Sequence, residues 1–149
     1  MKRALSIVLL LSMIFCLFGC DRSIEAGGGE PITDYDGVYI VVEGAQNVGG
    51  TEALIVRWVN ESEYMIGYGL GYDIEYLFGD EWRSVRITHF AIPEIWCMID
   101  PGESGTQQYR TQYFNMLLPG RYRVAVEFYV YDSPESTTAG RSYAEFTVK

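Results

Sequence analysis

The chain has few of the residues on which catalytic, disulfide-bonded and nucleic-acid-binding proteins depend. Its 149 residues include one histidine, His89, and three cysteines. A His-based triad or proton relay would therefore have to be built around this single imidazole. Basic residues are also scarce, with 11 lysines and arginines against 20 aspartates and glutamates, a net charge of −9. Such a chain repels phosphate backbones and anionic lipid headgroups, so we expect neither nucleic-acid binding nor electrostatic membrane docking.

Helical patterning is missing as well. After residue 19, no stretch has apolar residues at helical spacing with a capping residue at its start. Short runs of alternating apolar and polar residues take its place, and in the clearest one a single face holds Tyr122, Val124, Val126, Phe128 and Val130. Six similar runs lie at residues 37–44, 52–60, 72–78, 81–87, 107–114 and 141–149. Seven short strands separated by turn residues predict an all-β fold, an antiparallel sandwich or barrel.

The longest apolar run lies at the N-terminus. Lys2 and Arg3 form a basic head, apolar residues 4–18 follow, and the run stops at Gly19. This order is that of a secretory leader. A transmembrane helix is the alternative, but about 20 apolar residues are needed to span a bilayer and this run is shorter. We therefore predict a cleaved signal peptide over residues 1–19 and an extracytoplasmic location.

The end of this leader, LFGC, resembles the lipobox of bacterial lipoproteins. An aliphatic residue lies three positions before the cysteine and a small residue directly before it, although Phe18 is bulkier than the residue usual at its position. The resemblance implies cleavage after Gly19 and a diacylglyceryl group on the sulfur of Cys20, which makes membrane lipid the partner of that residue. An ordinary secreted protein is the alternative. With Cys16 removed and Cys20 lipidated, Cys97 has no partner in the chain, and no disulfide framework is expected.

Residues 20–36 are predicted to form the lipidated cysteine and a flexible tether. The segment contains three consecutive glycines, a proline and several charged residues, a composition that buries little apolar surface. The folded domain is then expected over residues 37–149, which is long enough to form its own hydrophobic core. Without residues 1–19 the chain has nine basic and 20 acidic residues, a net charge of −11.

The folded part resembles the bacterial Ig-like domains of small Gram-positive lipoproteins. The matching pieces are Asn60 with Ser62, GYDIEY at 71–76, GDEW at 79–82, DPGES at 100–104 and LPGRYRV at 118–124. The resemblance implies an immunoglobulin-like antiparallel β-sandwich of about seven strands, and it carries no catalytic residues. It also implies a structural tyrosine corner at Tyr122, whose hydroxyl bonds back to the preceding turn, and aliphatic packing by Val124 where antibody domains have a cysteine.

Two segments depart from this family pattern, and any individual function is expected to lie in them. They are EYMIGYGLGY at residues 63–72 and HFAIPEIWCMI at residues 89–99. In the first segment the candidate binding surface consists of Tyr64, Met65, Tyr68 and Leu70, because tyrosine offers a large contact area at low entropic cost. Simple packing of a long connection is the alternative for these residues.

No metal or cofactor site is predicted. His89, Glu94 and Cys97 could supply three zinc ligands if a loop folded back, but their spacing matches no structural zinc motif and a fourth ligand is missing. A surface histidine and a buried thiol are the alternative for His89 and Cys97.

Carboxylates are plentiful, and none is predicted to be catalytic. Asp73 and Glu75 share the polar face of one predicted strand, and Asp80 and Glu81 fall in a turn. Paired carboxylates act in glycoside hydrolysis when a cleft desolvates one of them. On a solvent face these side chains are instead expected to stay hydrated and ionised.

These features predict a non-enzymatic protein on the extracytoplasmic face of the cell membrane, without a cofactor. Its expected role is that of an Ig-like module that binds a protein or an envelope polymer through its loops or a sheet edge. A structural or accessory envelope domain is the second hypothesis, and an enzyme is the third. The sequence indicates neither the ligand nor the oligomeric state.

Overall fold

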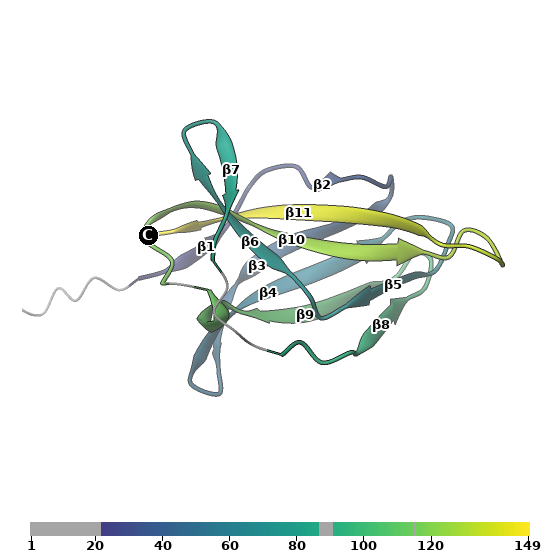
Figure 1. Ribbon diagram of the computed structural model, residues 1–149, viewed down its shortest axis with the longest axis horizontal. Coiled ribbons are helices and arrows are strands. Elements are labelled where there is room, and N and C mark those ends of the chain that lie inside the picture. Colours follow the sequence, from purple (N-terminus) through teal and green to yellow (C-terminus); the bar gives the residue numbers. More distant parts are fainter. Residues whose placement is uncertain (1–21, 87–90, 115) are drawn as a thin grey trace, which may run out of the picture.

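The protein is a two-layer β-structure in the computed structural model, which describes residues 22–86, 91–114 and 116–149 (Figure 1). The larger sheet contains β1 (Ile24–Ala26), β2 (Ile32–Thr33), β5 (Ile66–Gly69), β6 (Asp73–Phe78), β7 (Glu81–Ser84), β8 (Trp96–Ile99), β10 (Gly120–Val130) and β11 (Thr138–Val148). The smaller sheet has the order β3 (Val38–Val48), β4 (Thr51–Asn60), β9 (Ser104–Arg110). A 3-10 turn, η2 (Thr111–Tyr113), follows β9. Within the described ranges, no helix has the length and hydrophobicity needed to cross a bilayer.

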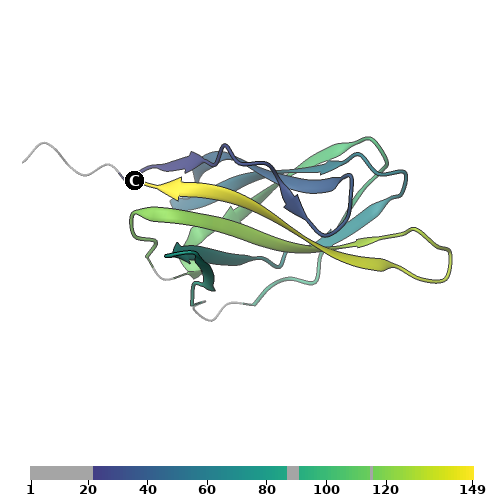
Figure 2. The ribbon, with the colours of Figure 1, turned by 90° about the horizontal axis from the view of Figure 1, so that it is seen from above.

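The two sheets pack face to face as the predicted antiparallel sandwich (Figure 2). Each of the seven predicted runs overlaps a strand: β3, β4, β6, β7, β9, β10 and β11. In β10 the predicted inward face is buried, whereas Arg121, Glu127 and Tyr129 on the other face are exposed. The run at 107–114 ends earlier than predicted, because the chain leaves the sheet at Arg110 and turns through η2.

Aromatic side chains fill the centre of the core. Trp58 of β4 is fully buried and stacks on Tyr68 of the facing sheet, with ring centroids 4.1 Å apart. Phe128 packs edge-on against the same indole at 6.0 Å. The indole Nε1–H donates to the hydroxyl of Tyr109 at 3.2 Å, so the polar atom of Trp58 is satisfied inside the core. The two layers are therefore joined by stacked rings in place of a disulfide.

Tyr122 has the hydrogen bond that the tyrosine-corner prediction describes. Its hydroxyl donates to the backbone carbonyl of Leu118 at 2.7 Å, four residues earlier in the chain. The ring is buried and stacks on Phe146 of β11 at a centroid distance of 5.5 Å. The side chain thus ties the turn before β10 to the strand pair β10–β11.

Tyr122→Phe is expected to lower the free energy of unfolding by about 1–3 kcal/mol, because it removes one hydrogen bond and strips the Leu118 carbonyl of its partner. The loss should fall near the lower end of that range, since exposed Leu118 allows water to reach the carbonyl. Tyr39→Phe is the matched control, because the Tyr39 hydroxyl donates to Glu61 at an exposed site. Denaturant midpoints measure both changes, and a Tyr122→Phe variant as stable as Tyr39→Phe would contradict the structural role.

The segment predicted as a flexible tether, residues 20–36, contains two short strands in the part that the structure describes. Strand β1 pairs with the end of β11, from Ile24 opposite Val148 to Ala26 opposite Phe146. Strand β2 pairs with the middle of β11. Local composition did not reveal these strands, because their hydrogen bonds come from the edge of β11, far away in the sequence.

Two further strands, β5 and β8, were not predicted. Strand β5 has glycine at two of its four positions, Gly67 and Gly69, so no apolar-polar alternation is visible in its sequence. Strand β8 has only four residues and ends the larger sheet as its edge. The two strands pair with each other, from Ile66 opposite Ile99 to Gly69 opposite Trp96. The two segments that depart from the family pattern are therefore neighbours in space.

Candidate functional site

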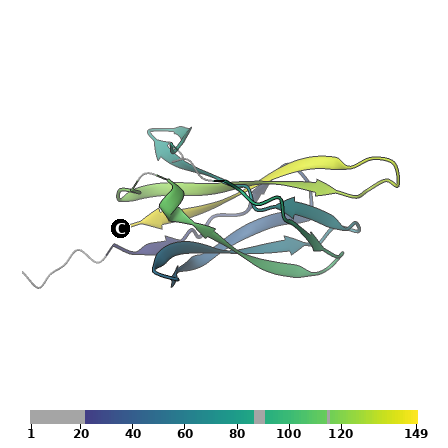
Figure 3. The same cartoon turned by 60° about the horizontal axis from the view of Figure 1, so that its bottom comes forward.

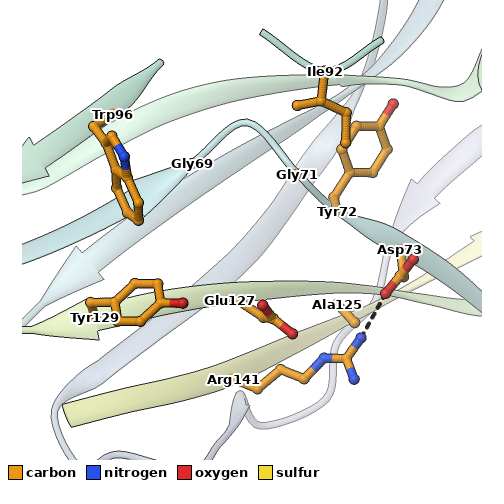
Figure 4. A pocket seen from close by; sticks show the side chains of 10 residues that line it. All are labelled: Gly69, Gly71, Tyr72, Asp73, Ile92, Trp96, Ala125, Glu127, Tyr129 and Arg141. Atoms are coloured by element: carbon orange, nitrogen blue, oxygen red, sulfur yellow. Dashed lines mark hydrogen bonds and ion pairs between the residues drawn. The ribbon is translucent and has the colours of Figure 1, made fainter. Parts of the chain in front are cut away.

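A surface hollow lies where β5 runs between β8 and β10, on the outer face of the larger sheet (Figure 4). Its volume is about 350 Å³, within the range of about 300–1,000 Å³ for small-ligand sites. We call it the β5 groove and define it by Gly69, Asp73, Trp96, Glu127, Tyr129 and Arg141.

Glycine forms the floor of the β5 groove. Side chains alternate along a strand, and in β5 Ile66 and Tyr68 are buried in the core, which places Gly67 and Gly69 on the outer face. At Gly67, an added Cβ would lie only 3.0 Å from the sulfur of Met98, so neighbouring side chains cover this position. At Gly69, the nearest atoms would be 4.0 Å away, which leaves the floor open.

Two exposed aromatic rings flank this floor. Trp96 lies opposite Gly69 on β8 and is 56% exposed, and Tyr129 lies opposite Gly67 on β10 and is 37% exposed. Their ring centroids are 5.5 Å apart with an interplanar angle of 69°, so one ring packs edge-on against the other. Further exposed apolar side chains on the same region are Ile92, Ile95, Met98 and Tyr131. Clustered exposed apolar side chains of this kind mark interaction surfaces on soluble proteins.

Charged side chains line the groove on the side of Tyr129, across from Trp96 (Figure 4). Arg141 of β11 donates from Nη2 to Oδ2 of Asp73 at 2.7 Å, which neutralises that carboxylate. Glu127 lies directly across from Arg141 in the β10–β11 register, yet within the described residues it has no hydrogen bond or ion pair. The Nε of Arg141 is buried and likewise lacks a partner in the described part of the chain. The groove thus holds one carboxylate that is free to accept hydrogen bonds.

Tyr72 closes the far end of the groove and acts as a wall. Its hydroxyl donates to the backbone carbonyl of Arg110, and its ring packs on Tyr109 at 4.5 Å. Burial raises the pKa of Tyr72 above its ordinary value of 10, so this phenol remains protonated in the physiological range. None of the ten residues labelled in Figure 4 is a serine, cysteine, histidine or lysine. The polar side chains of the groove are two carboxylates, one guanidinium and two phenols.

The four residues of the predicted binding surface do not form one surface. Tyr68 is only 3% exposed and stacks on Trp58, and burial raises its pKa. Tyr64 is exposed, while Met65 and Leu70 are half-buried. The inclusion of Tyr68 was wrong because the strand that contains it was not recognised, and in that strand its position points inward.

The prediction that Asp73 and Glu75 stay hydrated is wrong for Glu75. Its side chain is 13% exposed and accepts from the Nε of Arg123 at 2.5 Å. The Arg123 guanidinium is itself held over the rings of Trp82 and Tyr143, at 4.6 and 4.2 Å from their centroids. Glu75 therefore serves a structural ion pair, while Asp73 lines the groove.

The sequence also singled out Cys20 for lipidation and considered His89, Glu94 and Cys97 as zinc ligands. Cys20 and His89 lie outside the described residues. Glu94 is exposed, and Cys97 is half-buried with a free thiol. Within the described part of the chain, no three histidines, cysteines or carboxylates are grouped so as to hold a metal ion.

Sequence reasoning identified both segments that build the groove but missed its residues. The available signal was the spacing of glycines in GYG, at residues 67–69, which leaves two successive outward positions of a strand without side chains. Glu127 and Tyr129 were placed on the outer face of β10 by its alternation, but nothing local indicated that β5 lies beside them.

Comparison with known protein families identifies the family of this domain. The family model described as a bacterial Ig-like domain matches residues 34–146, which is most of the chain. No curated protein matches the chain significantly.

Proposed function

This chain belongs to the bacterial Ig-like domain family, and we propose that it is a lipid-anchored, extracytoplasmic, non-catalytic module that binds a partner in the β5 groove. Members of this family are generally non-catalytic and extracellular. The observation that carries the proposal is the groove itself, in which an open glycine floor lies between exposed aromatic rings and an unpaired carboxylate. Clustered exposed rings such as Trp96 and Tyr129 are typical of interaction surfaces.

The positions of the anchor and the groove suit this role. Ile24 follows Cys20 by four residues, which span at most about 14 Å, so a lipid on Cys20 would hold the sandwich close to the bilayer. Ile24 pairs with Val148, which pairs with Gly120 at the start of β10. Strand β5 pairs with Phe128–Val130 at the other end of β10, about 26–33 Å away along the strand. The aromatic end of the groove would therefore lie far from the membrane-proximal end of the sandwich.

The end of the sandwich that would face the bilayer is rich in exposed apolar side chains. The two described chain ends and the β6–β7 hairpin lie together there (Figures 1 and 3). Phe78 in this hairpin is 58% exposed, and Met116 and Leu118, just before β10, are 76% and 63% exposed. Apolar side chains at this end are consistent with close approach to a lipid surface.

Gly69→Val tests the groove as a binding site. Valine suits an outward strand position, and the free space around Gly69 lets its methyl groups fill the floor without displacing the backbone. Retention of the purified protein on delipidated cell envelopes should fall about tenfold or more. Ser84→Val, at an exposed strand position outside the groove, is the matched control and should bind like the parent. Equal retention of the two variants, with parental thermal midpoints, would contradict the proposal.

A further inference from the structure

We propose that the β5 groove binds a neutral glycan, with one sugar ring stacked on Trp96 and its hydroxyl groups directed at Glu127. This inference rests on the groove's proposed role as a binding site and assigns its ligand class. A pyranose ring is amphipathic, because its C–H groups form an apolar face and its hydroxyl groups project from the edge. The groove has the same division, with Trp96 and Ile92 on one side and Tyr129, Glu127 and Asp73 on the other (Figure 4).

Trp96 is the platform for the apolar face of the sugar. It is the most exposed of the three tryptophans, with more than half of its surface in solvent. Gly69, its partner on β5, leaves space beside it for a ring. Edge-on packing against Tyr129 restricts the orientation of the indole before any ligand arrives. A platform that is already ordered loses little conformational entropy on binding.

Glu127 is the acceptor for the hydroxyl groups. Hydrogen bonds to an ionised carboxylate are stronger than those between neutral groups. Asp73 is already engaged by Arg141, whereas Glu127 has no hydrogen bond or ion pair with any described residue. The Tyr129 hydroxyl lies on the same wall, as Figure 4 shows, and can donate or accept. A ligand with several hydroxyl groups matches this set.

Charge and position exclude other ligand classes in favour of a neutral glycan. The groove contains two carboxylates and one guanidinium, and the chain has a net charge of −9, so anionic polymers are repelled. A peptide that extends the sheet would bind along the free edge of β8. The groove lies instead on the face of the sheet, with its floor on β5, one strand inside that edge. A sugar ring can stack on a side chain of this face, whereas an extended peptide needs the hydrogen-bonding groups of a strand edge.

The test is a titration of the purified protein with cellotriose, maltotriose and the trimer of N-acetylglucosamine, followed by tryptophan fluorescence and calorimetry. At least one trisaccharide should bind saturably. Trp96→Ala should weaken that binding about tenfold or more, and Glu127→Gln should weaken it about threefold to tenfold. Trp82→Ala and Glu81→Gln, which change a tryptophan and a glutamate on β7 outside the groove, should leave the affinity unchanged.

The outcomes separate this inference from the proposed function. If Gly69→Val loses envelope binding, the groove is a binding site. The glycan assignment is nevertheless wrong if no trisaccharide binds, or if Trp96→Ala binds a trisaccharide like the parent. Saturable binding of tetramethylammonium or of an extended peptide, without trisaccharide binding, would also overturn the assignment. If Gly69→Val changes neither envelope nor trisaccharide binding, the proposed function itself fails.

Discussion

Cys20→Ala should move the protein from the membrane fraction to the medium, or leave it as an uncleaved precursor. The lipid would be attached to the Cys20 sulfur, so alanine removes the atom on which anchoring depends. A single acyl chain binds membranes marginally, whereas two chains, at about 0.8 kcal/mol for each buried methylene, hold a protein stably. The expected effect is therefore a nearly complete change of fraction where the leader is cleaved, and a complete loss of the palmitate label in either case.

Fractionation of cells and labelling with palmitate measure this effect. Cys97→Ser is the matched control, because it also removes a thiol but leaves Cys20 in place, and it should stay in the membrane fraction with its label. Palmitate labelling of Cys20→Ala at the parental level would contradict lipidation at this residue. Residues 24–26 are held in the sheet by their pairing with β11 and not by an anchor, so Cys20→Ala should leave the thermal midpoint unchanged.

The inward residues of the sandwich could be predicted from the sequence because their pattern is local. Alternation along β10 alone indicates that Val124, Val126 and Phe128 face the core, and they do. The Tyr122 hydrogen bond was also predictable, since its acceptor lies only four residues away, in the preceding turn.

Features that depend on a distant partner were not predictable in this way. Residues 24–26 form a strand only because the edge of β11 supplies their hydrogen bonds. Tyr68 looked like a surface tyrosine because the two glycines beside it hide the alternation of β5. Glu127 becomes part of a site only because Arg141, its opposite residue, bonds to Asp73. Each of these features depends on how distant strands pair, so the sequence of a single segment does not reveal it.

Asn60 shows how one buried amide holds the strands of the groove in place. It is the last residue of β4 and is fully buried. Its Nδ2 donates to the backbone carbonyls of Tyr64, Ile99 and Asp100 at 2.8, 3.1 and 3.2 Å. Its Oδ1 accepts from the backbone N–H and the hydroxyl of Ser62 at 3.1 and 2.6 Å. One side chain thus fixes the start of the β5 segment and the end of β8 to the opposite sheet.

Asn60→Asp should lower the free energy of unfolding at neutral pH by about 3–5 kcal/mol, the loss typical of an uncompensated buried charge. Aspartate keeps the shape of asparagine but has no N–H group, so a carboxylate oxygen would face the carbonyls of Tyr64, Ile99 and Asp100. Asn60→Ala is the control without a charge. It should lose about 1–3 kcal/mol, because it removes the amide donor from these carbonyls and the acceptor from Ser62, although the carbonyls of Tyr64 and Asp100 keep a second donor.

The pH dependence separates the charge from the lost hydrogen bonds. Burial against carbonyl oxygens would raise the pKa of the carboxyl group that Asn60→Asp introduces above its unfolded value of about 3.9. The folded state then favours the protonated form, so the penalty of Asn60→Asp is full above the raised pKa and shrinks as the pH falls toward about 3.9. Protonation also restores one O–H donor to the site.

Denaturant midpoints of the parent, Asn60→Asp and Asn60→Ala should be measured in parallel from neutral to acid pH. The difference in stability between the parent and Asn60→Asp should narrow as the pH falls, whereas the difference between the parent and Asn60→Ala should stay constant. A gap between parent and Asn60→Asp that stays constant with pH would show that the loss comes from the missing N–H donors and not from a buried charge.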